Sequence, residues 1–406
     1  MAAIVSTWTI DTLAGNGVSG YSGDGGSAVQ ACLNEPKGVS VDRHGNVYVA
    51  DSENHVVRKI DRATGVISTI AGRSIQEDGQ TIGWSDDTTA SAEEDPFADH
   101  DPTTKGHSTY TQHTDLSGTV RYWTNRTASV TRYAGDGGLA IHARLNFPTA
   151  VAVDREGNVY IADTMNHRVR MVEAATGVIS TLAGTGHAGF SGDGGAASEA
   201  TLNEPAALIV DETHQLYIAD QSNHRIRVVN LNTGRIGTIA GTGAATYDGD
   251  EKLAVNAALA GPSGLAQADD RLYIADTFNG RIRCLHLSSG QISTVAGDGA
   301  SYRYESPSDP PSPSLARPTG IAVGHNGDLF LTDSDNHLIR QWDWDSGTAF
   351  CMAGNGGSSY SGDGGAAREA GLCYPFGIAV DRGGSLLVAD TFNHRIRLLA
   401  LELGTS

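Results

Sequence analysis

The chain repeats one block of sequence six times, and this repetition limits its possible folds more than any other feature. Each copy holds a proline, a run close to Tyr-Ile-Ala-Asp and a motif close to Asn-His-Arg-x-Arg, and the first five copies continue with a run close to Gly-Val-Ile-Ser-Thr-Ile-Ala-Gly. The prolines are Pro36, Pro148, Pro205, Pro262, Pro318 and Pro375. The aspartates that end the second run are Asp51, Asp163, Asp220, Asp276, Asp333 and Asp390, each followed seven residues later by an arginine. Such regularity predicts one supersecondary unit stacked on copies of itself.

Read with a period of two, each copy predicts four short strands separated by turn residues. In the third copy these strands are expected at Ala206–Val210, Gln215–Ala219, Arg225–Asn230 and Arg235–Ala240. Four-stranded sheets at this interval are typical of the blades of a β-propeller. The 51 glycines fit an all-β chain with many tight turns, because glycine adopts positive φ without steric cost.

The two ends of the chain complement each other. The sixth copy stops soon after Leu399 and lacks its fourth run, whereas residues 6–15 supply a run of that kind. We therefore predict that the N-terminal strand completes the last blade. Closing the ring in this way removes the exposed strand edges of an open array.

The stretch from Pro148 to Arg170 resembles the NHL-repeat family of six-bladed β-propellers, and the resemblance covers nearly the whole chain apart from residues 73–134. It implies an all-β, six-bladed propeller that forms a single domain over residues 1–406. The family includes RNA-binding modules, sensor and adhesion domains and a lyase, so the resemblance implies the fold and leaves the function open. The lyase branch places zinc on histidines at the channel mouth, and the equivalent positions here hold none. The RNA-binding branch uses a basic top face, which is also not matched.

Residues that recur in every copy are expected to build the scaffold. The recurring histidines fall one to a blade, too far apart to share a metal ion, and the fourth copy has Gly280 instead; they are His55, His167, His224, His337 and His394. We expect each aspartate–arginine pair to tie the turn before the third strand to that strand. The Gly-Asp-Gly-Gly segments lack the lysine of a phosphate loop and the ligand set of a calcium loop. They predict a turn and a helical turn with the aspartate as N-cap; they begin at Gly23, Gly135, Gly192 and Gly362.

Function is sought where the repeat varies, at the residue before the proline and at the residue two after the aspartate. We expect both on one face of the ring, the top face, around the central channel. The candidate ligand-binding residues are Lys37, Phe147, Met165, Phe278, Arg317, Asp335, Tyr374, Phe376 and Phe392, and the candidate acid/base residues are Glu35, Glu53 and Glu204. Carboxylates beside aromatic rings suit a cationic or amine-bearing ligand. Variation at unconstrained loop positions is the alternative explanation.

The leading hypothesis is therefore a module that binds a small amine-bearing ligand or a peptide at the top of the channel. The alternative is an enzyme of the lyase, cyclase or condensing type that uses Glu35, Glu53 or Glu204 as general acid or base. No cofactor and no metal is expected for either. The sequence leaves the ligand, the reaction and the oligomeric state open.

Residues 73–134 interrupt the repeat between the first and second copies. They are polar and predict a hairpin of strands Thr119–Trp123 and Ser129–Tyr133, which we expect over the top face as a lid or wall. A decayed seventh blade is the rival explanation, although the segment lacks the apolar strands that a blade buries. A metal site is also left open, although the spacing matches no familiar zinc pattern; its candidate ligands are His100, Asp101, His107 and His113.

The overall composition restricts partners and location. A net charge of −19 disfavours binding to nucleic acid or to an anionic membrane. The sequence shows no transmembrane run and no signal peptide, which fits a soluble cytoplasmic protein or an exported one without its leader. Four cysteines do not make a disulfide framework, although a bond between Cys32 and Cys373 is left open.

Overall fold

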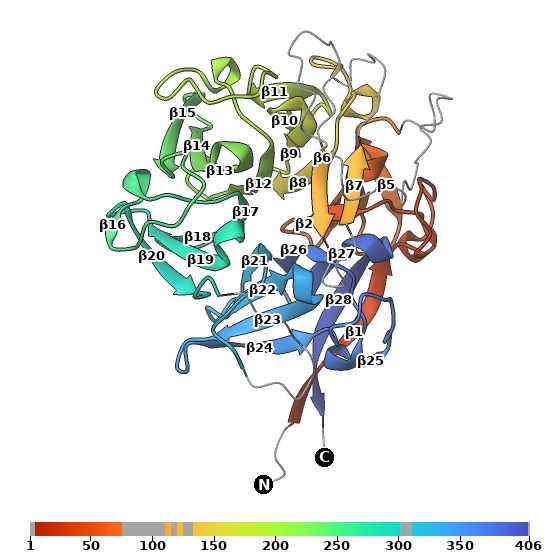
Figure 1. Ribbon diagram of the computed structural model, residues 1–406. Helices are drawn as coiled ribbons and strands as arrows, with labels where there is room; N and C mark the ends of the chain where they lie inside the picture. The colour runs from red at the N-terminus through yellow and green to blue at the C-terminus, as the bar shows by residue number, and fades with distance from the viewer. Residues whose placement is uncertain are drawn as a thin grey trace. The chain divides into compact units, whose positions relative to one another are not determined.

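The structure is a computed structural model that describes residues 5–74, 110–114, 120–124, 133–300, 304 and 311–404. The chain divides into two compact units. The first joins Met1–Ser74 to Tyr133–Ser406 and contains the propeller, and the second is Ile75–Arg132. Each unit is described by itself (Figure 1).

Six antiparallel sheets form the blades, numbered here by the copy of the repeat that each contains. Blade 1 contains β2 (Pro36–Val41), β3 (Val47–Asp51), β4 (Val56–Ile60) and β5 (Ile67–Ala71), and blade 2 contains β8 (Pro148–Val153), β9 (Val159–Asp163), β10 (Arg168–Val172) and β11 (Ile179–Ala183). Blade 3 contains β12 (Pro205–Val210), β13 (Gln215–Asp220), β14 (Arg225–Asn230) and β15 (Arg235–Ala240), and blade 4 contains β17 (Pro262–Ala268), β18 (Arg271–Asp276), β19 (Arg281–His286) and β20 (Gln291–Ala296). Blade 5 contains β21 (Pro318–Val323), β22 (Leu329–Asp333), β23 (Leu338–Asp343) and β24 (Thr348–Ala353), and blade 6 contains β26 (Pro375–Val380), β27 (Leu386–Asp390), β28 (Arg395–Gly404) and β1 (Val5–Ala14).

The first strand of each blade lies at the centre of the ring. These inner strands contact one another in a closed cycle, in the order β2, β8, β12, β17, β21, β26 and back to β2, and they gather around the centre of Figure 1. The N-terminal strand closes the ring as predicted, because β1 pairs with β28 from Val5 opposite Gly404 to Ala14 opposite Ile396. Strand β2 contacts β8 directly, so no seventh blade stands between blades 1 and 2.

The described part of the second unit is a two-stranded sheet of β6 (Tyr110–Thr114) and β7 (Val120–Thr124). A hairpin was predicted here, and its first expected strand, Thr119–Trp123, nearly coincides with β7. The partner of β7, however, precedes it in the chain instead of following it. A polar five-residue run lies on each side of β7 in the chain, and the loops that would connect β7 to them have similar lengths. The alternation of polar and apolar residues therefore does not show which of the two runs pairs with β7. The expected lid position stays a prediction. Of the proposed metal ligands of this segment, His113 lies in β6 opposite Arg121, whereas His100, Asp101 and His107 lie outside the described residues.

Short segments cover the outer edge of each blade. The edge of β20 pairs with β16 (Lys252–Leu253) and that of β1 with β25 (Gly365–Ala366), and isolated bridges such as Ser27 to Val66 serve the other blades. Covering edge strands prevents them from pairing with other chains. A single 3₁₀ turn follows five of these segments. Four of the turns were predicted from the Gly-Asp-Gly-Gly segments, namely η1 (Ala28–Gln30), η4 (Ala140–His142), η6 (Ala197–Glu199) and η11 (Ala367–Glu369), and η8 (Ala254–Asn256) was not.

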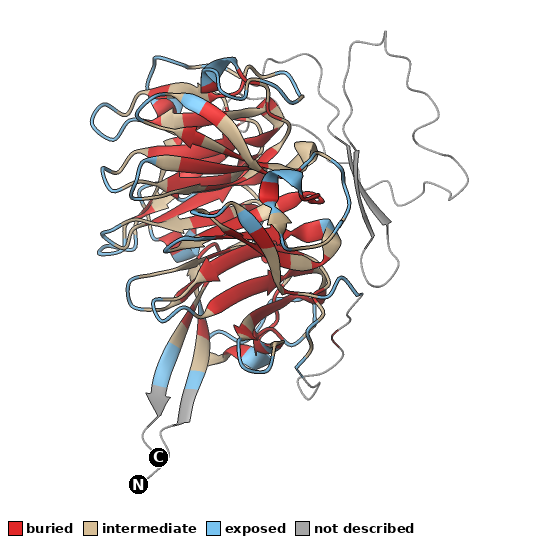
Figure 2. Cartoon of the chain, turned by 90° about the vertical axis from the view of Figure 1, so that its left-hand side faces the viewer, coloured by how far each residue is buried: buried red, intermediate tan, exposed pale blue. Residues whose placement is uncertain are grey.

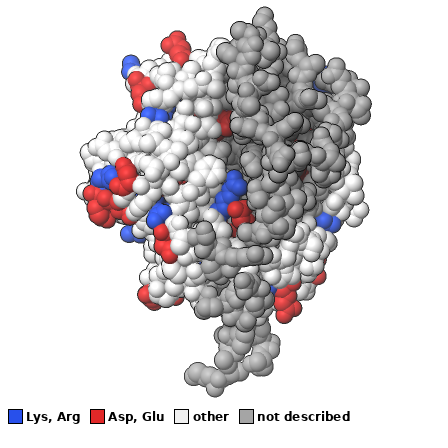
Figure 3. Space-filling model, viewed as in Figure 1, with Lys and Arg blue, Asp and Glu red and all other residues white. Residues whose placement is uncertain are grey.

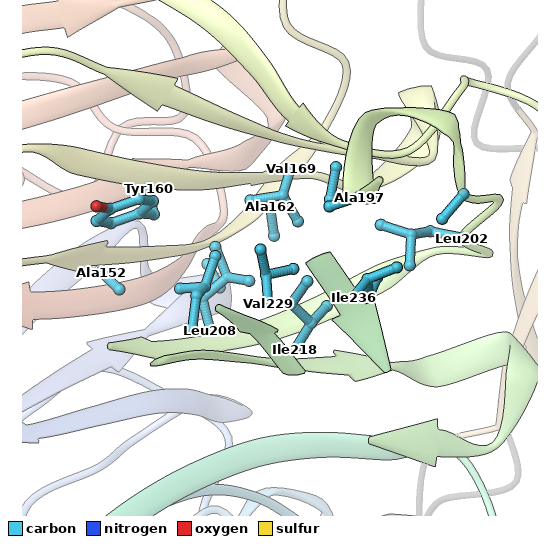
Figure 4. Packing of buried hydrophobic residues seen from close by; sticks show 14 residues of the cluster. Ala152, Tyr160, Ala162, Val169, Ala197, Leu202, Leu208, Ile218, Val229 and Ile236 are labelled. Carbon is cyan, nitrogen blue, oxygen red and sulfur yellow. The ribbon is translucent and has the colours of Figure 1, made fainter. Parts of the chain in front are cut away.

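Apolar side chains fill the space between adjacent blades. Figure 4 shows the cluster between blades 2 and 3, in which Val169 of β10 and Ala197 of η6 face Ile218 and Val229 of blade 3. Figure 2 shows that burial follows the strands, whereas exposed residues concentrate in the turns. Because every blade packs against two neighbours, the core is a ring of such clusters rather than one central core.

An arginine of the third strand lies fully buried in each blade. In blade 3, Nη1 of Arg227 donates to Oδ2 of Asp220 at 3.3 Å, and its Nη2 donates to Oδ1 of Asp193 at 2.8 Å. The ring of Phe190 lies over the guanidinium at 4.8 Å. The expected aspartate–arginine tie is therefore confirmed, and it recurs in the other blades at 3.1 to 3.4 Å.

The expected N-cap role of the Gly-Asp-Gly-Gly aspartates is wrong. The residue before each 3₁₀ turn is a different one, such as Ser27 or Ala196, and none makes a side-chain cap. The aspartates bind the buried arginines instead; the pairs are Asp24 with Arg58, Asp136 with Arg170, Asp193 with Arg227 and Asp363 with Arg397. A buried guanidinium gains more from a second carboxylate than a single helical turn gains from a cap, which explains the outcome.

Two smaller expectations are also resolved. Cys32, Cys284, Cys351 and Cys373 are free thiols, so the bond left open between Cys32 and Cys373 is not formed. Within the residues that the structure describes, no helix has the length and apolar character needed to cross a membrane.

We predict that replacing the buried arginine of one blade destabilises the whole propeller. Arg227→Met leaves Asp220 buried without its cation and should lower the free energy of unfolding by about 3–5 kcal/mol. Asp193→Asn removes only the partly exposed partner and should cost about 1 kcal/mol. Urea unfolding followed by tryptophan fluorescence measures both. Equal losses in the two variants would contradict a central role for the inner ion pair.

Candidate functional site

A backbone clamp holds the residue before the proline at the start of the inner strand in five of the six blades. In blade 3, Asn203 N–H donates to Oδ1 of Asp220 at 2.7 Å, and Ser222 N–H donates to the carbonyl of Asn203 at 3.1 Å. Glu204 N–H donates to Nδ1 of His167 from blade 2 at 3.2 Å. The two variable positions of the blade, Glu204 and Ser222, are therefore fixed beside each other.

The recurring histidines join neighbouring blades, which confirms that their role is structural. Each follows a 3₁₀ turn, has a φ of 51 to 58°, and accepts a backbone N–H of the next blade at 2.9 to 3.2 Å. The pairs are His55 with Phe147, His167 with Glu204, His224 with Gly261, His337 with Tyr374 and His394 with Glu35. The 3₁₀ turns are η2 (Ser52–Asn54), η5 (Thr164–Asn166), η7 (Gln221–Asn223), η9 (Thr277–Asn279), η10 (Ser334–Asn336) and η12 (Thr391–Asn393).

A second link between blades was not predicted. The hydroxyl after the blade aspartate donates to the carbonyl of the next blade's proline, as Thr164 does to Pro205 at 2.8 Å and Thr391 does to Pro36 at 2.9 Å. Ser52 and Ser334 make the same bond at 2.6 Å. A serine or threonine directly after the aspartate in five of the six copies was the available signal.

The one copy without the histidine departs from this geometry. In blade 4, Gly280 takes the place of the histidine. The N–H of Arg317, which a histidine there would accept, instead donates to Oδ1 of Asp333 at 3.4 Å. Positive φ occurs at the residue before the other five prolines and not at Arg317. Loss of the histidine thus coincides with a different backbone conformation at this position.

The top end of the channel, called the mouth below, comprises three residues of each blade: those directly before and after the proline, and the one two after the aspartate. The inner strands form a closed cycle, so their starts surround the channel at one end. Figure 3 shows basic and acidic groups lying next to one another on the described surface. The mouth is likewise mixed in charge.

The largest cluster of the mouth surrounds Lys37. Its Nζ lies 5.2 Å from the ring centroid of Phe147, 4.6 Å from that of Phe376 and 5.8 Å from that of Phe392. Oε2 of Glu35 lies 3.7 Å from the same nitrogen. These five predicted residues, from blades 1, 2 and 6, are therefore brought together. A cation of the protein itself occupies the aromatic cage that the sequence suggested for a ligand cation.

A second cluster lies at blades 4 and 5. Arg317 Nη1 is 4.0 Å from Oδ1 of Asp335, and the guanidinium lies 5.3 Å from the ring of Phe278. Phe278 is 61% exposed. A side chain at Gly261 would overlap the Phe278 ring, because a Cβ there would stand 2.3 Å from it. The absence of a side chain at Gly261 thus makes room for the aromatic ring.

Of the other predicted residues, Tyr374 contacts the Lys37 cluster through Phe392. Tyr374 is buried between His337 at 4.5 Å and Phe392 at 5.3 Å between ring centroids. Glu204 accepts a hydrogen bond from Oγ of Ser222 at 2.5 Å. Glu53 and Met165 are half-buried and bond through their N–H groups to the carbonyls of Asn34 and Asn146. No described contact joins Glu53 or Met165 to the Lys37 cluster.

Two mouth carboxyls have shifted pKa values. Burial raises the pKa of Glu35, which is 7% exposed, although Lys37 acts in the opposite direction. Burial also raises the pKa of Asp335, against the effect of Arg317. Within the part of the chain that the structure describes, no group of three or more histidine, cysteine or acidic residues could hold a metal ion.

Comparison with known proteins shows that the sequence of the chain matches NHL-repeat proteins. A model of the teneurin NHL domain matches residues 15–85 and 127–189, and a model of the NHL repeat matches residues 315–342 and 372–397. The chain is 30% identical to the protein SUPPRESSOR OF QUENCHING 1, chloroplastic, of Arabidopsis thaliana, over 64% of this chain and 26% of that protein. It is 28% identical to NHL repeat-containing protein 2 of Bos taurus, over 66% of this chain and 41% of that protein. The chain thus spans less than half the length of these curated relatives.

Solved structures share the architecture at low sequence identity. A protein of unknown function from Bacteroides thetaiotaomicron has a TM-score of 0.62 at 16% identity, covering 98% of this chain and 77% of that one. An auxiliary nutrient binding protein from the same organism has a TM-score of 0.58 at 13% identity, with the same coverage of 98% and 77%. At these identities the likeness shows the fold alone.

We predict that the inter-blade histidines make stability depend on pH. Burial lowers the pKa of His394 below its ordinary value of 6.5, and Nδ1 must stay unprotonated to accept the N–H of Glu35. Folding therefore favours the neutral ring, so this stabilisation is complete above pH 6.5 and is lost as the pH falls below that value. His394→Asn keeps a residue that tolerates positive φ and removes the titration.

The measurement is urea unfolding of the wild type and His394→Asn between pH 8 and pH 5. The wild type should exceed the variant by about 1–2 kcal/mol at pH 8, and the difference should shrink toward pH 5. His44→Asn, at an exposed histidine, should show no such trend. A difference that stays constant with pH would rule out the neutral-histidine link.

Proposed function

Because the chain belongs to the NHL-repeat family of six-bladed β-propellers, we propose that its mouth binds a small amine-bearing ligand or a peptide. The backbone clamp is the observation that carries this proposal. It fixes the main chain alike in most blades, while the side chain presented changes from blade to blade. A rigid frame that presents unlike side chains around one opening is a suitable surface for selective binding.

The distribution of these side chains favours a ligand with a polar and an apolar end. Blade 6 contributes Tyr374, Phe376 and Phe392, and blade 3, which stands opposite it in a ring of six, contributes Glu204 and Ser222. Among the salt bridges of the described residues, none involves Glu204, whereas Glu35 and Asp335 each have a protein cation close by. Of these three carboxylates, Glu204 is therefore the best suited to accept a ligand amine.

The alternative function, an enzyme of the lyase, cyclase or condensing type, has one observation in its favour. The pKa of Glu35 is raised by burial, as a general acid requires. The same carboxyl, however, is only 7% exposed and lies beside Lys37, whose ammonium is surrounded by three aromatic rings, so access of a substrate atom to the carboxyl is restricted. The geometry thus favours binding over catalysis.

We predict that Glu204 recognises the ligand amine. Suitable probes are phenethylamine and the peptide Phe-Gly-Phe with a free or an acetylated amino terminus. The free amine should bind at least tenfold more tightly than the acetylated form, because a charged hydrogen bond contributes about 1.5–3 kcal/mol. Glu204→Gln should remove this preference, as measured by isothermal titration calorimetry.

Glu199→Gln is the matched control, because Glu199 lies exposed on η6 outside the mouth. It should bind like the wild type. Equal binding of the free and acetylated peptides to the wild type, or an unchanged preference in Glu204→Gln, would refute the proposed role of the mouth.

A further inference from the structure

The ammonium group of Lys37 has unused hydrogen-bonding capacity. It carries three N–H donors, and its side chain is 13% exposed. Among the described residues, its closest polar contact is with Oε2 of Glu35 at 3.7 Å, a long contact that occupies no more than one of the three donors. The rings of Phe147, Phe376 and Phe392 attract the charge but do not replace an oxygen acceptor.

Lys37 is also unusual within its own repeat. The residue directly after the proline in the other copies is Thr149, Ala206, Ser263, Thr319 or Phe376. The inner strand needs no cation here, since five blades form the same strand without one. A lysine in one blade alone, held in a partly desolvated cage, is therefore a feature that the scaffold does not explain.

The surroundings of Lys37 specify the chemistry of its missing partner. A cation in an apolar setting is stabilised best by an anion with oxygen acceptors. The Lys37 side chain is 13% exposed, so an anion can reach the ammonium from solvent. Glu35 is nearly buried and lies 3.7 Å away, so it offsets the charge while leaving at least two of the three donors unused.

We propose that Lys37 binds a carboxylate of the ligand, so that the mouth recognises a zwitterion. The inference rests on the proposed function and narrows it to a peptide or amino-acid derivative with both a free amine and a free carboxylate. The amine binds Glu204 in blade 3, and the carboxylate binds Lys37 in blade 1. The apolar part of the ligand packs against Phe376 and Phe392 in blade 6, next to Lys37.

The test compares matched probes on the wild type, Lys37→Met and Lys37→Arg. The probes are Phe-Gly-Phe with a free or an amidated carboxyl terminus, and 3-phenylpropionate, which has a carboxylate and no amine. We expect amidation to weaken binding to the wild type at least tenfold. Lys37→Met should bind the free and the amidated peptide equally and should not bind 3-phenylpropionate. Lys37→Arg keeps the charge and should retain part of the preference.

The outcomes separate this inference from the proposed function. Equal binding of the free and amidated peptides to the wild type overturns the role of Lys37, while the preference for a free amine still supports the function. Binding of 3-phenylpropionate that depends on Lys37, with no effect of acetylation, supports the role of Lys37 and overturns amine recognition. No binding of any probe overturns both. Tighter binding of phenethylamine to Lys37→Met would mean that Lys37 competes for the cage, which also overturns the inference.

Folding of the variants does not limit the test. Methionine keeps the apolar stem that packs among the three rings, and thermal melting of each variant reports its folding. If Lys37→Met does not fold, the proposal is tested by the binding of the free and the amidated peptide to the wild type and to Lys37→Arg. A preference for the acid that Lys37→Arg preserves supports the proposal, and its absence in the wild type refutes it.

Discussion

The blade aspartate is the constraint on which both the scaffold and the mouth depend. In blade 3, Oδ2 of Asp220 accepts from the buried Arg227 and from Asn223, while its Oδ1 accepts from the backbone of Asn203. One carboxylate thus joins the interior of the blade to the segment that presents the mouth residue. Burial opposes its ionisation and raises the pKa of its counterparts Asp51 and Asp163 to about 6. Such a charge persists in an interior only with several partners at once.

The residues that hold the fold are different from the residues that vary at the mouth. The clamp uses backbone N–H groups, the aspartate and the histidine, so it places no demand on the side chain before the proline. That side chain is Glu204 in blade 3, Phe147 in blade 2 and Tyr374 in blade 6, with nearly the same positive φ in each. The scaffold can therefore keep its geometry while the mouth changes its chemistry. Repeat proteins commonly vary their binding surfaces in this way.

The sequence allowed the blades and the closing strand to be predicted, because the repeat aligns equivalent positions. It did not allow contacts between unlike parts of the repeat to be predicted. The pairing of Asp193 with Arg227 spans 34 residues, and a local N-cap was the simpler local explanation. Lys37, Phe147 and Phe392 were each identified as candidates, but they come from three blades. The contacts between side chains of different blades depend on how the ring closes. The repeat pattern does not specify these contacts.

The charges already present within the mouth determine which ligands remain compatible with it. Lys37 lies in an aromatic cage beside Glu35, and Arg317 lies beside both Asp335 and Phe278, so both aromatic sites already hold a cation. A ligand cation that entered either aromatic site would have to displace the lysine or the arginine from the rings and leave its carboxyl partner without a cation. A ligand that brings an anion to Lys37 and an amine to Glu204 leaves the existing pairs intact. Because removing one partner of a buried pair costs more than adding a new partner at its exposed side, these pairs support the proposal that the ligand is a zwitterion.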